Sequence, residues 1–396
     1  MVSVELQDTF LSLVRLGIGN GTVNGSRFTV HGSVDWEALK VLADRQGLSA
    51  VVLDALNTDG TNLTDTIPVQ MKLEWIGEVL QNYEARYRAY EKAIGSLAGW
   101  YNEHGFKMMV LKGYACALDW PRPEHRPCGD IDIWLFGAQK EADEVLSHTD
   151  FTDNTDKIAG QARNEGFRVQ NQSRIGELEN RVVIDNSHHH HTVFEWEGFT
   201  VENHYDFLNV HVRPSNKRME AKLKELADFD DNLNLNVSDN IYLPSVAFDA
   251  IYLLRHCAAH FASTEMTVRQ VLDWGFFMEK HHQEIDWDEY IPYLKEEGMY
   301  RFYNLMGLFC MKHLGFDAAI FHGLYEDDLL ERFSNEIMEP EFKDRENGKL
   351  LHSLSVKPRR WWHNRWKNRL CYPDSPWQEF AYGLWAKVLK PSHFWQ

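Results

Sequence analysis

Two carboxylates interrupt an apolar strand pattern, and they constrain the fold more than any other feature. Asp130 and Asp132 flank one residue at the start of the run DIDIWLF. Side chains alternate across a strand, so both carboxylates face the same way, about 7 Å apart along the backbone. Such a pair in a buried strand costs several kcal/mol unless cations or hydrogen bonds compensate. Either a cation such as Mg²⁺ binds here, or Asp130 caps a turn after Gly129 while Asp132 faces solvent on an edge strand.

The segment before this strand predicts a small α/β unit. FKMMVLKG is a short apolar run bounded by glycines, GYACALDW is compatible with a helix, and PRPEHRPCG is a proline-rich loop. We therefore expect a strand, a helix, a loop and a second strand between residues 106 and 136. Two more strands are expected in HHTVFEWEGFTVENHYDF, with a turn at Gly198.

Helical periodicity surrounds these strands. Apolar residues recur every three or four positions from Trp75 to His104, which predicts a long helix that stops at Gly105. Asp35 is the expected N-cap of WEALKVLADRQ, and the helical pattern returns strongly in SVAFDAIYLLRHCAAHFAS and TVRQVLDWGFFMEKHH. The predicted class is α+β, with four regions: N-terminal helices (1–74), an α/β core (75–215), a helical domain (216–345) and a basic Trp-rich segment packed on the body (346–396).

Composition excludes several classes of protein. Lys and Arg total 41 against 59 for Asp and Glu, and the net charge of -18 argues against an extended nucleic-acid surface. No apolar run reaches about 18 residues, so no transmembrane segment is expected. The N-terminus lacks a basic leader, and the five cysteines are scattered without CxxC spacing. These features favour a cytoplasmic protein with reduced thiols.

Four motifs resemble the uncharacterised bacterial nucleotidyltransferases of the polymerase-β-like superfamily: VLKGYACALDWP, HRPCGDIDIWL, FTVENHYDF and TVRQVLDW. The resemblance covers about residues 35 to 390. It rests on an LKG turn, an Arg before the DxD strand and a later Glu two residues before a His, here Lys112, Gly113, Arg126, Asp130, Asp132, Glu202 and His204. It implies a polymerase-β-like core, a short mixed sheet with helices, flanked by N-terminal and C-terminal helical regions.

The activity that this resemblance implies is metal-dependent transfer of a nucleotidyl group from a nucleoside triphosphate to an unidentified hydroxyl or phosphate acceptor. Two ions about 3.5 to 4 Å apart can serve the attacking and leaving oxygens, and they need carboxylates on adjacent strands. Period two turns Glu202 and Asp206 to the same face of their strand, and Glu202 is the preferred third ligand. The expected catalytic and Mg²⁺- or Mn²⁺-binding residues are Asp130, Asp132 and Glu202.

Basic residues provide the expected nucleotide contacts. Lys112, Gly113 and Arg126 would approach the phosphates, and Lys112 would replace a serine contact, because Gly113-Tyr114 stands where the wider superfamily has Gly-Ser. Arg269 and Asp273 lie one helical turn apart, either as an exposed ion pair or on a helix that closes over the nucleotide. The long loop before Asp130 could also turn Arg122, His125 and Arg126 toward an anionic substrate.

Three further features allow more than one interpretation. Strand alternation lets at most two of His188 to His191 converge, on a metal, on a substrate or in solvent. His256 and His260 have half of a zinc motif without its Glu, and we expect them at the edge of the core. The segment KPRRWWHNRWKNR could bind an anionic partner or pack on the body. The missing serine suggests a catalytically inactive nucleotide-binding module as the alternative function, and the basic Trp-rich segment suggests an anionic-partner adaptor.

Overall fold

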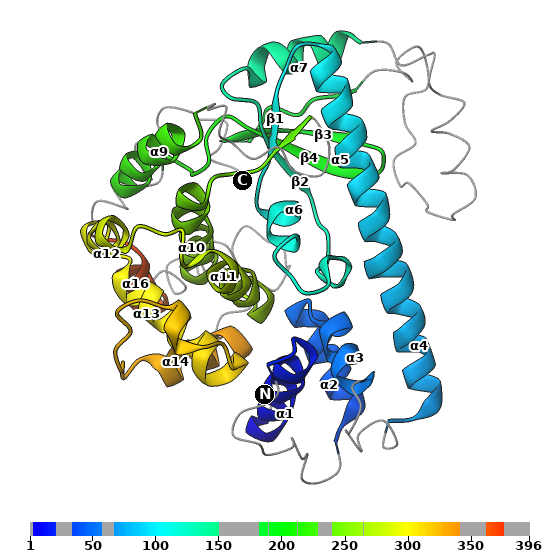
Figure 1. Cartoon of the computed structure of the whole chain (residues 1–396), viewed down its shortest axis with the longest axis vertical. Coiled ribbons are helices and arrows are strands. Elements are labelled where there is room, and N and C mark those ends of the chain that lie inside the picture. Colours follow the sequence, from blue (N-terminus) through cyan, green and yellow to red (C-terminus); the bar gives the residue numbers. More distant parts are fainter. Residues whose placement is uncertain are drawn as a thin grey trace.

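A mixed sheet lies at one end of a largely helical molecule (Figure 1). The computed structural model describes residues 3–20, 34–57, 67–149, 182–188, 190–211, 213–228, 240–263, 265–340 and 362–375. Within these residues the fold is α+β and mostly helical, with a five-stranded sheet. The expected short mixed sheet between helices is therefore present.

The strand that carries the acid pair is the centre of this sheet. The strand order is β3-β4-β2-β1-β5. β2 runs parallel to β4 and antiparallel to β1, while β5 lies parallel to β1 at the other edge. All four residues of β2 are buried, so the edge-strand interpretation of Asp132 is wrong. The strands are β1 (Met108–Val110), β2 (Ile131–Trp134), β3 (His191–Trp196), β4 (Phe199–His204) and β5 (Ile241–Tyr242).

β3 and β4 form the hairpin that the sequence predicts. Its turn consists of Glu197 and Gly198, whose φ angles are 46° and 82°. Positive φ at both central residues matches the twist of the flanking strands, and glycine adopts it without strain. The antiparallel register pairs His191 with His204.

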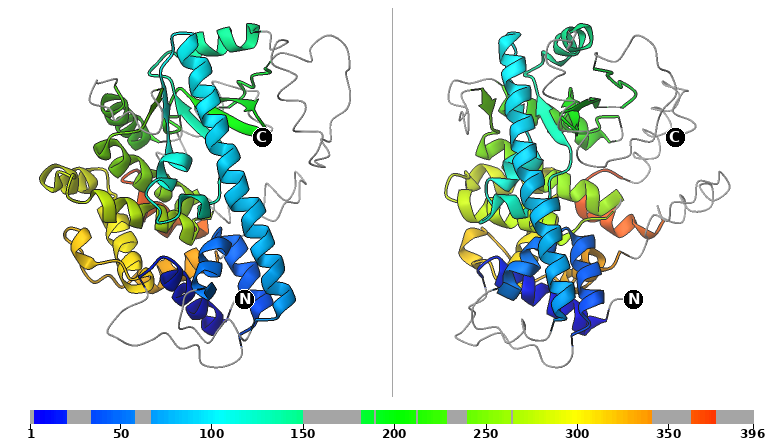
Figure 2. Two further views of the ribbon diagram at one scale, coloured as in Figure 1. Left: turned by 45° about the vertical axis from the view of Figure 1, so that its right-hand side comes forward. Right: turned by 90° about the vertical axis from the view of Figure 1, so that its right-hand side faces the viewer.

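The predicted long helix runs along most of the molecule in both Figure 1 and Figure 2. It comprises α4 (Val69–Val79), a π-helical segment η1 (Leu80–Ala85) and α5 (Arg86–Glu103). It begins at Val69 rather than at Trp75, because Pro68 occupies the N-cap, where the missing N–H costs nothing. The chain leaves it at Gly105, which has a φ of 81°.

One hydrophobic core joins the N-terminal and C-terminal helices. Asp35 caps α2 as predicted, since its Oδ1 accepts from the Ala38 N–H at 3.0 Å. α1 packs on α3 and on η3 (Cys310–Leu314), so segments far apart in sequence share one interior. A second core lies between α5 and the sheet. The helices of the first core include α1 (Val4–Gly17), α2 (Trp36–Gln46), α3 (Ser49–Asn57), α10 (Val246–Ser263), α11 (Val268–His281), α12 (Trp287–Glu296), α13 (Tyr300–Phe309), α14 (Leu330–Met338) and α16 (Arg365–Cys371).

The α/β unit between 106 and 136 has the predicted order. β1 leads into the short helix α6 (Lys112–Ala117), then a loop with the turn η2 (Pro123–His125), then β2. Helix α7 (Gln139–His148) follows, and α9 (Pro214–Leu226) comes after the hairpin. Most of the segment 150–180, for which the sequence pattern was ambiguous, lies outside the described residues.

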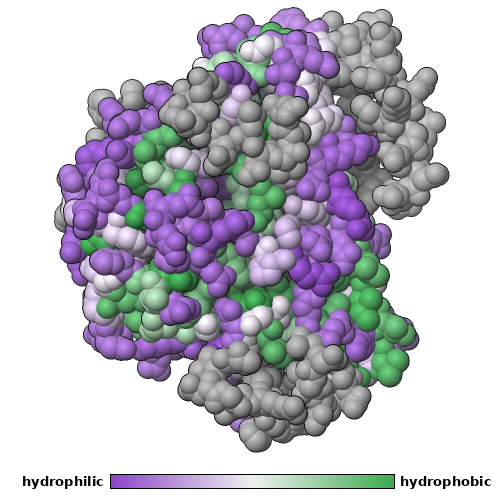
Figure 3. Space-filling view, in the orientation of Figure 1, coloured by the Kyte–Doolittle hydropathy of each residue, from purple (hydrophilic) through white to green (hydrophobic). Residues whose placement is uncertain are grey.

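The surface is largely hydrophilic in Figure 3, with an apolar area over α4. There Val69 and Leu73 expose 75% and 59% of their surface. None of the helices described is long and apolar enough to cross a membrane.

Candidate functional site

The parallel pairing of β2 with β4 brings the predicted carboxylates together. Asp132 and Glu202 are direct partners in the register, and Asp130 lies just before β2. All three line one cavity of about 430 Å³. The same cavity is lined by every residue that the sequence suggested for nucleotide contact: Lys112, Gly113, Arg126, Arg269 and Asp273.

Asp132 is the buried centre of the carboxylate group. Lys112 Nζ lies 2.8 Å from its Oδ1, and His204 Nε2 lies 3.0 Å from the same oxygen. Burial opposes ionisation of Asp132, but the charge of Lys112 and the hydrogen bond of His204 outweigh it and hold its pKa below the usual range. Asp132 is therefore an anion at neutral pH.

His204 is a member of the site that the predicted catalytic set omitted. Its Nε2 also lies 3.5 Å from Glu202 Oε2. Burial favours the neutral ring, but the hydrogen bonds to Asp132 and Glu202 outweigh this effect and raise the pKa of His204. The signal in the sequence was period two, which turns His204 and Glu202 to the same face.

Asp130 lies at the exposed side of the group. Partial burial raises the pKa of its carboxyl, and the negative charges of Glu202 and Asp132 raise it further. Three carboxylates so close together repel one another, and oxygen donors of this kind are what Mg²⁺ and Mn²⁺ prefer. The donor set thus fits a divalent cation, and the roles assigned to its members stay predictions.

The long helix positions the loop that carries Asp130. The Tyr90 hydroxyl donates to the Asp130 carbonyl at 2.7 Å, and Arg86 Nε donates to the Cys128 carbonyl at 3.3 Å. A Cβ on Gly113 would lie 3.0 Å from the Tyr90 hydroxyl oxygen. The glycine at this position therefore allows α6 to approach both α5 and the loop.

Arg126 forms a buried fork with Asp273, so the exposed pair considered for Arg269 and Asp273 is wrong. Nε and Nη2 of Arg126 donate to the two Asp273 oxygens at 2.7 and 3.0 Å. Trp120 Nε1 donates to the same carboxylate at 2.9 Å. Asp273 is only 7% exposed, because α11 packs beneath α6 at this point.

Arg269 remains available to an anion. It lines the cavity, and it forms no ion pair or side-chain hydrogen bond within the described part of the chain. Burial lowers its pKa, and the positive charge of Arg126 lowers it further. Arginine nevertheless stays protonated in proteins. A half-buried arginine without a carboxylate partner is a favourable binding group for a phosphate.

The other two basic residues of the long loop do not reach the cavity. Arg122 Nη1 and His125 Nδ1 lie 2.8 and 2.6 Å from the Asp54 carboxylate on α3. Both also approach Glu84 on η1. The expectation that they face a substrate is therefore wrong for both, because they attach the loop to the N-terminal helices.

Glu202, rather than Asp206, lies among the carboxylates. Asp206 comes after the end of β4, pairs with Lys224 on α9 and does not line the cavity. The strand has ended before Asp206, so period two no longer controls its direction.

The histidine run does not follow strand alternation, because β3 begins only at His191. The His188 ring stacks on His191 with centroids 4.7 Å apart, and the His190 ring lies 4.4 Å from His191. Three described members of the run thus gather, where alternation allowed two. His189 lies outside the described residues.

His256 and His260 line the cavity, instead of lying only at the edge of the core. Their rings are 4.6 Å apart on α10. Burial lowers the pKa of His260 to about 4, with a further contribution from the charge of Lys112, and it lowers that of His256 still more clearly. Both rings are therefore neutral at physiological pH.

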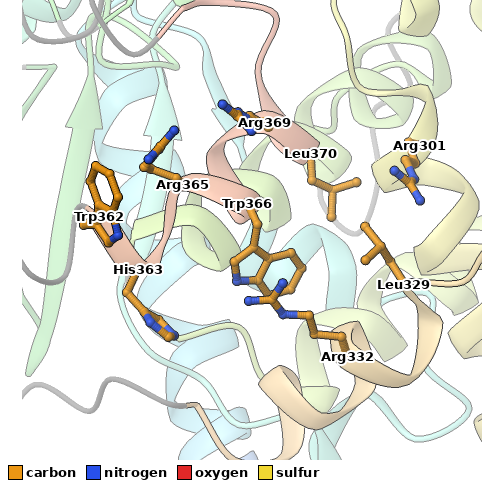
Figure 4. Close-up of a pocket in the computed structure, with 9 residues that line it drawn as sticks. All are labelled: Arg301, Leu329, Arg332, Trp362, His363, Arg365, Trp366, Arg369 and Leu370. Atoms are coloured by element: carbon orange, nitrogen blue, oxygen red, sulfur yellow. The ribbon is translucent and has the colours of Figure 1, made fainter.

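The described part of the basic Trp-rich segment, residues 362–375, packs on the helical body. The Arg332 guanidinium lies 4.2 Å from the Trp366 ring, and buried Lys367 pairs with Glu336. Lys357, Arg359, Arg360 and Trp361 lie outside the described residues. Figure 4 shows the second cavity that results, of about 440 Å³, lined by Arg301, Leu329, Arg332, Trp362, His363, Arg365, Trp366, Arg369 and Leu370.

Comparison with known protein families identifies the family to which the chain belongs. A model of the family described as uncharacterised nucleotidyltransferase matches residues 32–315. The chain therefore belongs to that family. The match contains the sheet, the cavity with its carboxylates and both flanking arginines. No curated protein and no solved structure matches the chain.

Proposed function

We propose that this protein is a metal-dependent nucleotidyltransferase with a polymerase-β-like core, which transfers a nucleotidyl group from a nucleoside triphosphate to a hydroxyl or phosphate acceptor. The observation that carries the proposal is the meeting of three carboxylates with Lys112 and Arg269 at one cavity. Acidic and basic groups at one cavity suit a metal–triphosphate complex, whose cation and phosphates need both signs of charge.

Each side chain then has a chemical task. Asp132 and Glu202, register partners on β2 and β4, would hold Mg²⁺ or Mn²⁺, together with Asp130 at the exposed side of the group. An ion bound by these carboxylates would neutralise phosphate charge and make the acceptor oxygen a better nucleophile. Arg269 binds phosphate oxygens, and Lys112 adds a positive charge beside Asp132. The acceptor oxygen bonds to the α-phosphorus as the bond to the bridging oxygen breaks, pyrophosphate leaves, and the acceptor's proton passes to a carboxylate.

The test is calorimetric titration of each nucleoside triphosphate with Mg²⁺ or Mn²⁺ present and then removed by chelation. Asp130→Asn and Glu202→Gln are expected to abolish metal-dependent binding, and so is the double variant Asp130→Ala with Asp132→Ala. Asp130→Asn is the cleanest change, because loss of Asp132 also leaves Lys112 without its buried partner. Asp206→Asn is the matched control, since Asp206 follows the same strand but lies outside the cavity. Well-folded wild type that binds no triphosphate would overturn the proposal.

Turnover separates an enzyme from an inactive nucleotide-binding module. Gly113-Tyr114 lacks the serine hydroxyl that the wider superfamily offers to the triphosphate, and the Tyr114 hydroxyl donates to Glu91 instead. We expect pyrophosphate release from the bound triphosphate once an acceptor is supplied from small hydroxyl and phosphate compounds, RNA and protein. Metal-dependent binding without release in the presence of all these acceptors would favour the inactive module.

Anionic-partner binding is a second candidate, favoured by the cavity of Figure 4. Four of its lining residues are arginines and none is acidic, in a protein of net charge -18. Arg365 lies over the ring of Trp362, which is 66% exposed, so an aromatic and a cationic group lie together at this cavity. Salt-sensitive association with an anionic polymer that is lost in Arg365→Glu and kept in Asp130→Asn would support it.

A further inference from the structure

Three imidazoles gather at the edge of the carboxylate site. His190, His191 and His204 each place one possible ligand atom within 4.8 Å of those of the other two. They come from two parts of the hairpin, because His191 opens β3 and is the register partner of His204 at the end of β4. His190 lies next to them, and its carbonyl accepts from the Tyr205 and Asp206 N–H groups at 3.0 and 3.1 Å. The backbone therefore brings these three residues side by side.

Two of these rings have buried nitrogens without hydrogen-bond partners. Nδ1 of His190 and Nδ1 of His191 are inaccessible to solvent, and neither meets a donor or acceptor within the described residues. His191 is 6% exposed and His204 only 1%. Buried polar atoms are nearly always paired in native proteins, so two unpaired ring nitrogens in neighbouring histidines indicate a missing partner.

Acceptors near both nitrogens fix the orientation of the third ring, that of His204, as is usual for metal-binding histidines. His204 Nε2 lies 3.0 Å from the Asp132 carboxylate, and its Nδ1 lies 3.2 Å from the Asp206 carbonyl. Because both nitrogens have acceptors, an ion that binds one of them displaces its proton, while the other keeps an acceptor that orients the ring. His191 Nε2 lies 3.7 Å from Glu202 Oε1, too far for a hydrogen bond but close enough for the charge of Glu202 to act on the ring.

We propose that His190, His191 and His204 bind a divalent transition-metal ion of the Zn²⁺ class, beside and distinct from the Mg²⁺ site of the carboxylates. Nitrogen donors suit Zn²⁺, Co²⁺, Ni²⁺ and Cu²⁺, whereas Mg²⁺ prefers oxygen and retains its waters. The nearby negative charges of Asp132 and Glu202 favour a cation at this position. This site does not depend on the proposed transferase activity.

Co²⁺ is a suitable probe, because its visible absorption reports nitrogen coordination directly. The full chain, freed of metals by chelation, is titrated with Co²⁺ and then with Zn²⁺ as competitor. His190→Ala and His191→Ala are each expected to weaken Co²⁺ binding at least about tenfold, as loss of even an orienting group does at such sites. His188→Ala is the matched control, because this ring stacks on His191 but lies outside the set and is 47% exposed.

Three outcomes would overturn the proposal. Unchanged Co²⁺ affinity in both His190→Ala and His191→Ala would exclude the imidazoles. An equal loss of Co²⁺ affinity in His188→Ala would show that the exposed histidines of the run bind metal without a preformed site. Co²⁺ binding that disappears in Asp130→Asn but persists in His190→Ala would place the ion at the carboxylates. If His191→Ala does not fold, His190→Ala decides, because His190 is only half-buried.

The same variants keep this proposal separate from the transferase. Asp130→Asn should abolish Mg²⁺-dependent triphosphate binding and leave the Co²⁺ spectrum intact. His190→Ala should lose the spectrum while triphosphate binding remains, since His190 does not line the cavity.

Discussion

Removal of the charge on Asp273 should destabilise the protein severely, because Asp273 is the only carboxylate within ion-pair distance of Arg126 in the part of the chain that the structure describes. Their two hydrogen bonds are 2.7 and 3.0 Å long, and the side chains are 8% and 9% exposed. Such a two-bond ion pair is strong, but it stabilises the folded protein only while both side chains are charged.

Asp273→Asn keeps the shape of the side chain but leaves the Arg126 charge buried beside Arg269. Breaking a buried pair from one side typically costs 3–5 kcal/mol, which corresponds to roughly a hundredfold or more in the unfolding equilibrium. The matched control is Glu326→Gln, which removes an exposed ion pair that Lys312 forms at 2.7 Å. An exposed pair contributes about 0–1 kcal/mol.

The assay is urea unfolding followed by far-UV circular dichroism and tryptophan fluorescence, for Asp273→Asn, Arg126→Met and the double variant. The double variant should be less destabilised than the sum of the two single variants, since it leaves neither charge unpaired. If Asp273→Asn costs no more than Glu326→Gln, or if the two single losses simply add, the assignment of this pair as a coupled buried contact is refuted.

Three further changes test other parts of the structure. Burial raises the pKa of Asp249 to about 8, above about 3.9 in unfolded chains, so the folded state retains a proton and stability falls as pH rises from about 4 to 8. The unfolding midpoint of Asp249→Asn should therefore exceed that of wild type by a margin that grows over this pH range. A margin that stays constant with pH would contradict this prediction. A Cβ on Gly17 would lie 2.1 Å from the Val51 carbonyl oxygen, so Gly17→Ala should lower stability by about 1–3 kcal/mol in thermal unfolding, whereas Gly95→Ala, which meets nothing within 4 Å, should not. Arg269→Gln should weaken metal-dependent triphosphate binding about tenfold in calorimetry, through loss of a charged hydrogen bond, whereas Arg122→Gln, whose partner is Asp54, should change it little.

Local rules of chain geometry account for what the sequence predicted well. The cap by Asp35 and the turn at Gly198 depend on residues a few positions apart. The common face of Glu202 and His204 depends only on strand alternation. The acid pair of the DxD strand is also a local pattern, and the resemblance to a nucleotidyltransferase family, which the family match confirms, was carried by short motifs of this kind.

Tertiary structure decided which partner each charged group meets. The periodicity of α11 could not show that Asp273 pairs with Arg126 and leaves Arg269 facing the cavity, because this depends on how α11 packs against α6. Arg122 and His125 likewise turn away to Asp54, which lies on a helix far earlier in the chain.

The gathering of His190, His191 and His204 was equally hidden, because it depends on where β3 begins and on its register with β4. Periodicity and capping are set by the nearest residues, so the sequence alone determined the hairpin, the course of the long helix and the common face of Glu202 and His204. Distances between distant side chains are set by the packing of whole elements, and only the folded chain could decide them.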